Sequence, residues 1–222
     1  IIYVNGALLN MQIIQSDNVL IIAQHSGDEV FGCGGLIAHI VEAGNAPHVV
    51  VLTGGESSHN GCCNTPKADI VTARRRLTRE AMSKLGLPAS HLHELNFADG
   101  KICKNNREEC VTLKALINNI NPSAILIPYY FRSRVLDFVI GFTKDIPIYG
   151  YCILNKICQK IFCFLHQCHQ LRLSDRELKL KTDAINIYTS AMAPCGEPWI
   201  GNLPNHMLNL KKSDIEILVK LK

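Results

Sequence analysis

The chain has no long uninterrupted apolar run and no strong excess of charge of either sign. Its most apolar late stretch, Ile148 to Leu165, is broken by the polar residues Asn155, Lys156, Gln159 and Lys160, which makes it a poor membrane-spanning segment. No charged segment followed by an apolar stretch opens the chain, so no secretory signal is predicted. The net charge of +4, from 23 basic and 19 acidic residues, does not favour nucleic-acid binding.

The sequence also lacks internal repeats, low-complexity segments and a convincing linker. With 222 residues and 47% apolar side chains, it can build one sizeable core, so a single domain over residues 1–222 is expected. Ten cysteines are present, and Cys33, Cys152 and Cys163 stand within apolar runs. Buried free thiols are therefore expected, which indicates a reducing, cytoplasmic location. The sequence leaves the oligomeric state open.

Short apolar runs alternate with segments of helical spacing. This alternation predicts a doubly wound α/β fold, Rossmann-like, with a mostly parallel sheet flanked by helices. Two capping signatures, Asn106 with Glu109 and Ser174 with Glu177, predict helix starts. The expected strands are Asn18–Gln24, His48–Thr53, Leu92–Phe97, Ala124–Ile127 and Ile148–Leu154, and the expected helices are Leu36–Ala43, Ala68–Leu85, a helix ending at Ile120 and one ending near Met192.

The turn after the first strand holds the best candidates for chemistry. In a parallel α/β sheet, ligands bind beyond the carboxyl ends of the strands, and this turn reads His25, Ser26, Gly27, Asp28, Glu29. An imidazole nitrogen and a carboxylate oxygen three residues apart suit Zn²⁺ when the turn is tight. The alternative is a solvated turn in which Asp28 or Ser26 caps the following helix.

The stretch AQHSGDEVFGCGG resembles the signature of the PIG-L/LmbE family of zinc-dependent sugar N-deacetylases, which usually reads A-H-P-D-D-E-x-x-G-C-G-G. Further resemblances follow in order along residues 18 to 192: VVVLTGGE, Arg74 with Leu85-Gly86, Asp99-Gly100, Asn121-Pro122 before ILIP, and a late helix with Lys181 and Tyr188. The resemblance implies hydrolysis of an N-acetyl group from a glucosamine-type glycoconjugate. It implies that His25 and Asp28 bind zinc and that Arg74 contacts the substrate.

The chain departs from the family pattern where the chemistry is most demanding. The general-base aspartate of the family falls on Gly27, and its second motif, H-x-D-H, falls on Val135, Leu136, Asp137 and Phe138. A metal ligand and an oxyanion-stabilising histidine are thus missing, and zinc would be held weakly or not at all. Glu29 and Asp137 remain as weak candidates for the base. Two hypotheses stay open: an N-deacetylase with an incomplete catalytic set, and a sugar-binding pseudoenzyme.

Other arrangements point less clearly to function. Cys33 between two glycines could present a thiol nucleophile at a strand-to-helix turn, although packing is the simpler interpretation. The same glycines lack the G-x-G-x-x-G spacing of dinucleotide-binding folds. Two histidine and cysteine groupings have simpler interpretations. His59, near Cys62 and Cys63, is expected to be an exposed loop histidine, and the segment with His166, His169, Cys163 and Cys168 is expected to be a packed helix with polar tips.

Overall fold

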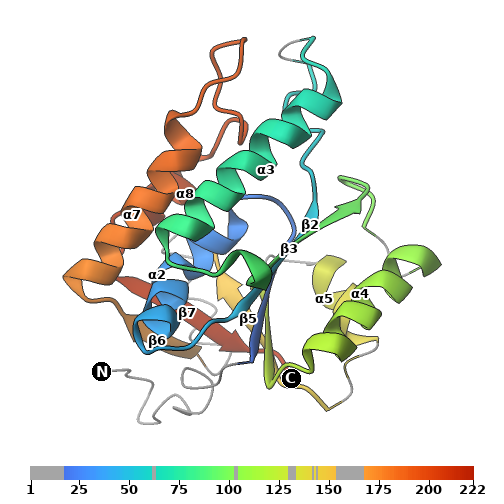
Figure 1. Cartoon of the computed structure of the whole chain (residues 1–222), viewed down its shortest axis with the longest axis vertical. Coiled ribbons are helices and arrows are strands. Elements are labelled where there is room, and N and C mark those ends of the chain that lie inside the picture. Colours follow the sequence, from blue (N-terminus) through green and yellow to red (C-terminus); the bar gives the residue numbers. More distant parts are fainter. Residues whose placement is uncertain are drawn as a thin grey trace.

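A computed structural model describes residues 18–61, 64–102, 105–129, 134–141, 143, 145–153 and 168–222. Its centre is a seven-stranded sheet with helices on both faces, as Figure 1 shows. The strands are β1 (Val19–Ala23), β2 (His48–Thr53), β3 (Leu92–Phe97), β4 (Ala124–Tyr129), β5 (Ile148–Cys152), β6 (Cys168–Arg172) and β7 (Ile215–Lys220).

The strand order is β3-β2-β1-β4-β5-β7-β6. Strands β1 to β5 are parallel, whereas β7 pairs antiparallel with both β5 and β6. The chain therefore winds outward from β1 in one direction through β2 and β3, and in the other through β4 and β5. This arrangement confirms the predicted doubly wound, mostly parallel sheet and places the topological switch between β1 and β4.

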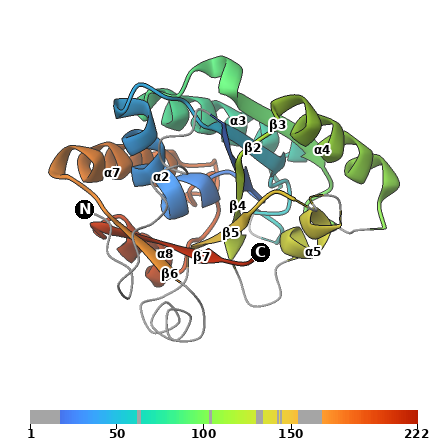
Figure 2. The same cartoon turned by 90° about the horizontal axis from the view of Figure 1, so that it is seen from below.

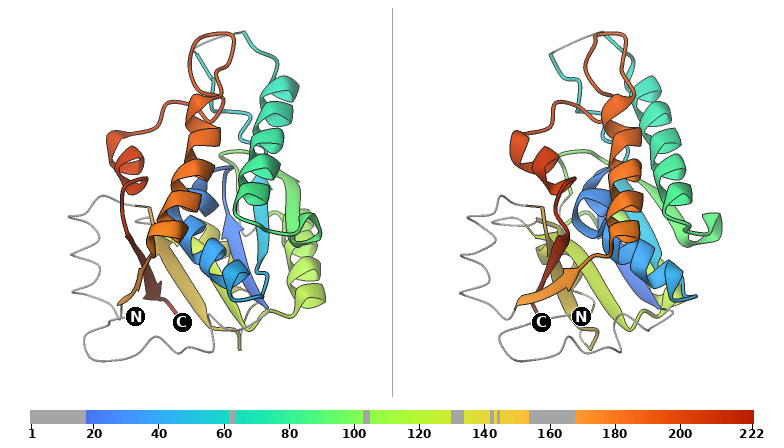
Figure 3. Two further views of the ribbon diagram at one scale, coloured as in Figure 1. Left: turned by 60° about the vertical axis from the view of Figure 1, so that its left-hand side comes forward. Right: turned by 90° about the vertical axis from the view of Figure 1, so that its left-hand side faces the viewer.

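Two helical layers cover the sheet, and Figures 2 and 3 show them from further directions. One apolar cluster joins α2 (Asp28–Glu42), α3 (Lys67–Lys84) and α7 (Asp175–Ser190) to one face. The other joins α4 (Arg107–Ile120) and α5 (Arg134–Ile140) to the opposite face. Strand β1 serves both clusters because side chains alternate along a strand: Ile21 lies in the first and Ile22 in the second.

The predicted helix starts are largely confirmed. Ser174 and Glu177 form a complete capping box at α7, in which each side chain accepts a hydrogen bond from the other's backbone N–H. Asn106 caps α4 by accepting from the N–H of Glu109. The Glu109 carboxylate instead accepts from the N–H of Ala98. Asn121 ends α4 in the left-handed conformation, just before Pro122.

Helix α2 begins earlier than the sequence pattern indicates. The glycine-rich stretch before Leu36 was expected to be a turn, yet it is helical from Asp28 onward. The glycines allow close packing instead: a Cβ on Gly32 would lie 2.2 Å from the Tyr151 ring, and one on Gly35 would lie 2.4 Å from the Leu173 side chain. The sequence patterns also did not predict helix α5, the short helices η1 (Ala89–His91) and α8 (Asn205–Leu210), or strands β6 and β7. No helix among the described residues has the length and apolarity needed to cross a bilayer.

A buried ion pair ties the last strand to two helices. Lys181 Nζ on α7 lies 2.9 Å from Glu216 Oε1 on β7, and both side chains are almost fully buried. The same carboxylate accepts the N–H groups of Gly35 and Leu36, in the middle of α2, at 2.8 Å each. With these partners the buried carboxylate is satisfied, and β7 is locked against α2 and α7.

We expect Lys181→Met to lower the free energy of unfolding by about 3–5 kcal/mol, because Glu216 would be left as a buried charge without its counter-ion. The double variant Lys181→Met/Glu216→Gln should lose less free energy of unfolding than Lys181→Met alone. Urea denaturation measures both. Lys179→Met is the matched control, since its exposed pair with Asp183 on the same helix should contribute less than about 1 kcal/mol. This account would be contradicted if the double variant lost as much free energy of unfolding as Lys181→Met and Glu216→Gln lose in sum.

The capping box predicts a pH-dependent contribution to stability. Burial alone would raise the pKa of Glu177, but hydrogen bonds from the Ser174 N–H and from His39 outweigh burial and lower that pKa below 4.5. The charged carboxylate therefore stabilises the fold above about pH 4.5, and this contribution disappears as the pH falls through the lower folded-state pKa. Glu177→Gln should lower the free energy of unfolding by about 1 kcal/mol at pH 7 and by progressively less below pH 4.5. Exposed Asp175→Asn, in the same helical turn, is the control, and equal pH dependence in both variants would refute the assignment.

Candidate functional site

The turn between β1 and α2 lies at the topological switch and is held by a buried carboxylate. Glu29 Oε2 accepts the N–H of Gly27 at 2.9 Å, and its Oε1 accepts the hydroxyl of Tyr188 on α7 at 2.6 Å. Burial raises the pKa of Glu29 to about 7, even though the Tyr188 hydrogen bond acts against the rise. Because Asp28 also accepts the N–H of His25 at 3.1 Å, the turn is tight, which is the condition under which His25 and Asp28 can approach one ion.

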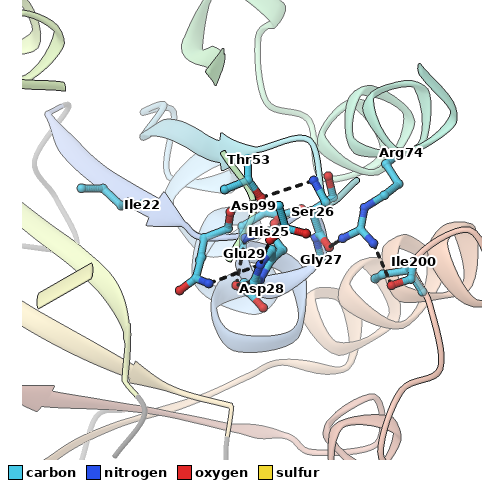
Figure 4. Close-up of polar contacts among 12 residues, drawn as sticks. Ile22, His25, Ser26, Gly27, Asp28, Glu29, Thr53, Arg74, Asp99 and Ile200 are labelled. Carbon is cyan, nitrogen blue, oxygen red and sulfur yellow. Dashed lines mark hydrogen bonds and ion pairs between the residues drawn. The ribbon is translucent and has the colours of Figure 1, made fainter. Parts of the chain in front are cut away.

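His25 lies between two carboxylates (Figure 4). Its Nε2 is 2.8 Å from Asp99 Oδ1, and its Nδ1 is 3.7 Å from Asp28 Oδ2. Burial opposes protonation of the ring, but the neighbouring carboxylates of Asp28 and Asp99 outweigh it and raise the His25 pKa to about 9. The hydrogen bond from His25 in turn lowers the pKa of Asp99 to about 2. In the absence of a metal, the site therefore holds an imidazolium between two carboxylates at neutral pH.

Asp99 is a site residue that the sequence showed only as part of an Asp-Gly turn. It follows β3 by two residues, and its Oδ2 accepts the N–H of Ser57 from the loop after β2, at 3.0 Å. The Glu56 carboxylate accepts the N–H of Asp99 at 2.9 Å. A search for acidic residues just beyond strand ends would have found Asp99, because the ends of parallel strands meet at one edge of the sheet.

Arg74 reaches the site from α3 and is 3% exposed. Its guanidinium donates to the carbonyl oxygens of Ile200 at 2.8 Å and Ser26 at 3.3 Å, and Figure 4 shows it directed at Ile200. Its Nε has no hydrogen-bond partner among the described residues. Gly55 packs against the guanidinium so closely that a Cβ there would lie 2.4 Å from Nε. Burial lowers the pKa of Arg74, and the nearby acidic groups oppose this effect.

These residues open onto a cavity of about 320 Å³. Its polar part comes from the ends of β1 and β2, from α3 and from the turn after β3. Its apolar part comes from a segment close to the C-terminal end of the sequence, which the sequence patterns did not connect with the site. The lining residues are His25, Ser26, Gly27, Asp28, Gly55, Ser57, Ser58, Arg74, Asp99, Ile200, Leu203 and Met207.

Gly27 occupies the position where the family pattern has its general base. Its φ is 104°, a backbone conformation that L-residues with a side chain rarely adopt. A Cβ built on Gly27 would lie 2.4 Å from Cδ1 of Ile200, so a side chain at this position would require the Ile200 side chain to move. The backbone and the packing thus both suit glycine at this position.

The described residues do not make up a complete zinc site. His25 Nδ1 and Asp28 Oδ2 are 3.7 Å apart, close to the separation of about 3.4 Å that two ligands of one tetrahedral zinc ion have. Asp99, on the other ring nitrogen, is placed to orient the imidazole as carboxylates do around metal sites. A catalytic zinc site needs a third protein ligand, and within the described part of the chain no group of three ligating side chains is found.

The remaining candidates lie apart from the cavity. Asp137 is an exposed side chain on α5, while its neighbours Val135 and Phe138 are buried in the core. Glu29 is fully buried below the turn. Cys33 is also fully buried, and burial raises its thiol pKa well above the ordinary value, so packing explains it better than nucleophilic catalysis.

The free-thiol prediction is confirmed for Cys33 and Cys152, which are buried and unbridged. His59 is buried, and its Nε2 donates to the Trp199 carbonyl at 3.3 Å. His59 is thus not the exposed loop histidine that was expected, and His169 is buried on a strand, β6, rather than on the expected helix. Of the neighbours grouped with these histidines, Cys168 is buried on β6. The others, Cys62, Cys63, Cys163 and His166, lie outside the described residues.

Comparison with protein families finds a match to the model of the PIG-L family, described as GlcNAc-PI de-N-acetylase, over residues 20–137. The match covers more than half of the chain and includes the turn after β1, Arg74 and Asp99. A search of curated proteins finds no match.

Solved structures share the fold at low sequence identity. The N,N'-diacetylchitobiose deacetylase from Pyrococcus horikoshii is 18% identical with a TM-score of 0.62, over 82% of this chain and 74% of that one. A zinc-inhibited form of teicoplanin deacetylase is 13% identical with a TM-score of 0.64, over 91% and 97%. A 4-carboxy-2-hydroxymuconate hydratase from Pseudomonas putida is 17% identical with a TM-score of 0.63, over 92% and 95%. The fold thus occurs with more than one reaction, so the residues of the site must decide the chemistry.

Gly27→Ala should destabilise the protein more than Gly44→Ala does. Both glycines have positive φ, but nothing lies within 4 Å of a Cβ on Gly44, which makes it a control for backbone strain alone, at about 1 kcal/mol. The contact with Ile200 should add a further 1–3 kcal/mol or so at Gly27. Ile200→Val removes the Cδ1 atom and should relieve part of this excess in the double variant, as measured by chemical denaturation. Equal costs at Gly27 and Gly44 would show that Ile200 does not restrict the position.

Proposed function

Because the chain belongs to the PIG-L family of GlcNAc-PI de-N-acetylases, we propose that its cavity binds an N-acetylglucosamine-type glycoconjugate without hydrolysing the amide efficiently. We further propose that residues 1–222 make up a single domain of this family. The observation that carries the proposal is Gly27, which leaves the position of the general base without a side chain and with Ile200 packed against it.

The catalytic deficit follows from what the site lacks. A positioned general base contributes roughly 10²–10⁴-fold to the rate, and an oxyanion donor contributes about 10²–10³-fold. In the family pattern the metal-ligating and oxyanion histidines fall on Val135 and Phe138, which are both buried in the apolar core. A metal held by His25 and Asp28 alone would be bound weakly. Loss of all three functions leaves binding as the property that the cavity supports best.

The cavity keeps features that suit a sugar amide. Arg74 is a buried cation with no ion-pair partner among the described residues, so a ligand oxygen near its guanidinium would gain a charge-assisted hydrogen bond. The Ser57 and Ser58 side chains and the Asp99 carboxylate offer partners for sugar hydroxyl groups. Ile200 and Leu203 offer an apolar wall for the methyl group of an acetamide.

A second candidate function is zinc-dependent N-deacetylation, and one observation favours it. His25 and Asp28 lie near ligand spacing, with Asp99 on the second ring nitrogen. When bound, zinc would polarise the amide carbonyl. In that case His25 and Asp28 would hold the ion, Asp99 would orient His25, and Arg74 would position the substrate.

Binding and hydrolysis can be separated with one pair of probes, methyl N-acetylglucosaminide and N,N'-diacetylchitobiose. We expect saturable binding by calorimetry and no acetate release above background. Arg74→Met should weaken binding by about 1.5–3 kcal/mol, or more than tenfold, because a charged donor is lost. Arg76→Met, an exposed position on the same helix, should leave binding unchanged, and thermal unfolding would verify that both variants are folded.

Metal content decides between the two candidates. After dialysis, elemental mass spectrometry should find far less than one zinc ion per chain. About one zinc per chain that is lost in His25→Ala, together with acetate release, would favour the deacetylase. The absence of binding by either probe would refute the proposed ligand class.

A further inference from the structure

Three histidines gather at the end of the sheet opposite the cavity. His48 is the first residue of β2, His91 ends η1, and His93 is the second residue of β3. The rings of His48 and His91 are stacked with centroids 4.2 Å apart, and those of His48 and His93 are 5.3 Å apart. Strands β2 and β3 are parallel, so these residues lie together at their amino ends, whereas the cavity lies at the carboxyl ends of the strands.

The closest contact in this histidine cluster joins two ring nitrogens. His48 Nδ1 lies 3.1 Å from His93 Nε2, which requires at least one of the two nitrogens to carry a lone pair rather than a proton. None of the three rings has a carboxylate ion-pair partner among the described residues, and all three are half-buried. Burial, followed by the influence of the His91 and His93 rings, lowers the pKa of His48 to about 4. The N···N contact thus places an unprotonated imidazole nitrogen, the form that binds metal ions, beside a second imidazole nitrogen.

We propose that His48 and His93 form a binding site for a divalent transition-metal ion that prefers imidazole, such as Ni²⁺, Cu²⁺ or Zn²⁺. Two nitrogens that each bind one such ion at about 2.0–2.1 Å, with an angle between 90° and 109°, lie about 2.9–3.4 Å apart. The observed 3.1 Å falls within this range, so the two nitrogens already have the separation that a chelating pair needs, and each ring has to turn only until its lone pair points at the shared ion.

His91 positions the pair rather than completing it. Its Nδ1 donates to the carbonyl oxygen of Ala46 at 3.1 Å, and its ring lies almost parallel to that of His48, with an interplanar angle of 4°. This stacking holds the plane of the His48 ring, so Nδ1 of His48 stays on the side of His93 when the ring turns within that plane. Two protein ligands leave the other coordination positions to water, so the site is of moderate affinity. It is independent of the cavity and of the function proposed for it.

Calorimetric titration with Ni²⁺ tests the site in the full chain carrying His25→Ala, so that His25 and Asp28 cannot compete. Ni²⁺ is preferred to Cu²⁺ as the probe because Cu²⁺ oxidises free thiols. We expect one ion per chain, and roughly tenfold or greater weakening in His48→Asn and in His93→Asn. His206→Asn, a half-buried histidine on α8, is the control and should not change binding. Mg²⁺, which prefers oxygen ligands, should give no saturable signal.

A second measurement keeps the test decisive if a variant fails to fold. In the His25→Ala chain, substoichiometric Ni²⁺ should broaden the imidazole NMR signals of His48 and His93 before those of the other histidines. Absence of saturable Ni²⁺ binding would overturn the proposal. Binding that is unchanged in both cluster variants, or broadening that begins at other histidines, would overturn it as well.

Discussion

The buried carboxylate of Glu29 is the constraint on which the site depends. It joins the Gly27 N–H to the Tyr188 hydroxyl, so the turn after β1 is held against α7. Without a partner, a carboxylate in this position would carry a large desolvation cost, and the two hydrogen bonds offset part of it, since burial still raises the Glu29 pKa to about 7. The fixed turn presents His25 and Asp28 at the topological switch, and it gives Gly27 the positive φ that only glycine adopts readily.

The segment around Ile200 completes the cavity from the opposite side. The carbonyl of Ile200 accepts a hydrogen bond from Arg74, while its side chain lies over Gly27. One residue therefore contacts both the guanidinium and the position that the family pattern assigns to its general base. The packing around Gly27 is thus adapted to a residue without a side chain.

The fold by itself does not determine which reaction a protein catalyses. Deacetylases and a hydratase share this fold at identities of 13–18%. A doubly wound sheet supplies strand ends that converge on one edge, and the side chains placed there determine the chemistry. In this chain those side chains are an imidazole between two carboxylates, a buried arginine and an apolar wall. This set suits recognition of a polar ligand with a small apolar group.

Local patterns in the sequence determined the alternation of strands and helices, the helix caps at Asn106 and Ser174, and the signature after β1. These features depend on residues close together in the chain, so composition and spacing suffice to predict them. The helical glycine run of α2, by contrast, depends on close approach by Tyr151 and Leu173 from distant elements.

Only the tertiary structure brought together residues far apart in the chain: Asp99 with His25, Ile200 with Gly27, Glu216 with Lys181, and His93 with His48. No periodicity encodes such pairs, because each contact results from how whole strands and helices pack. The sequence therefore identified the family and pointed to the turn after β1, which lines the cavity. The packing decided which side chains complete that site and which space remains for a ligand.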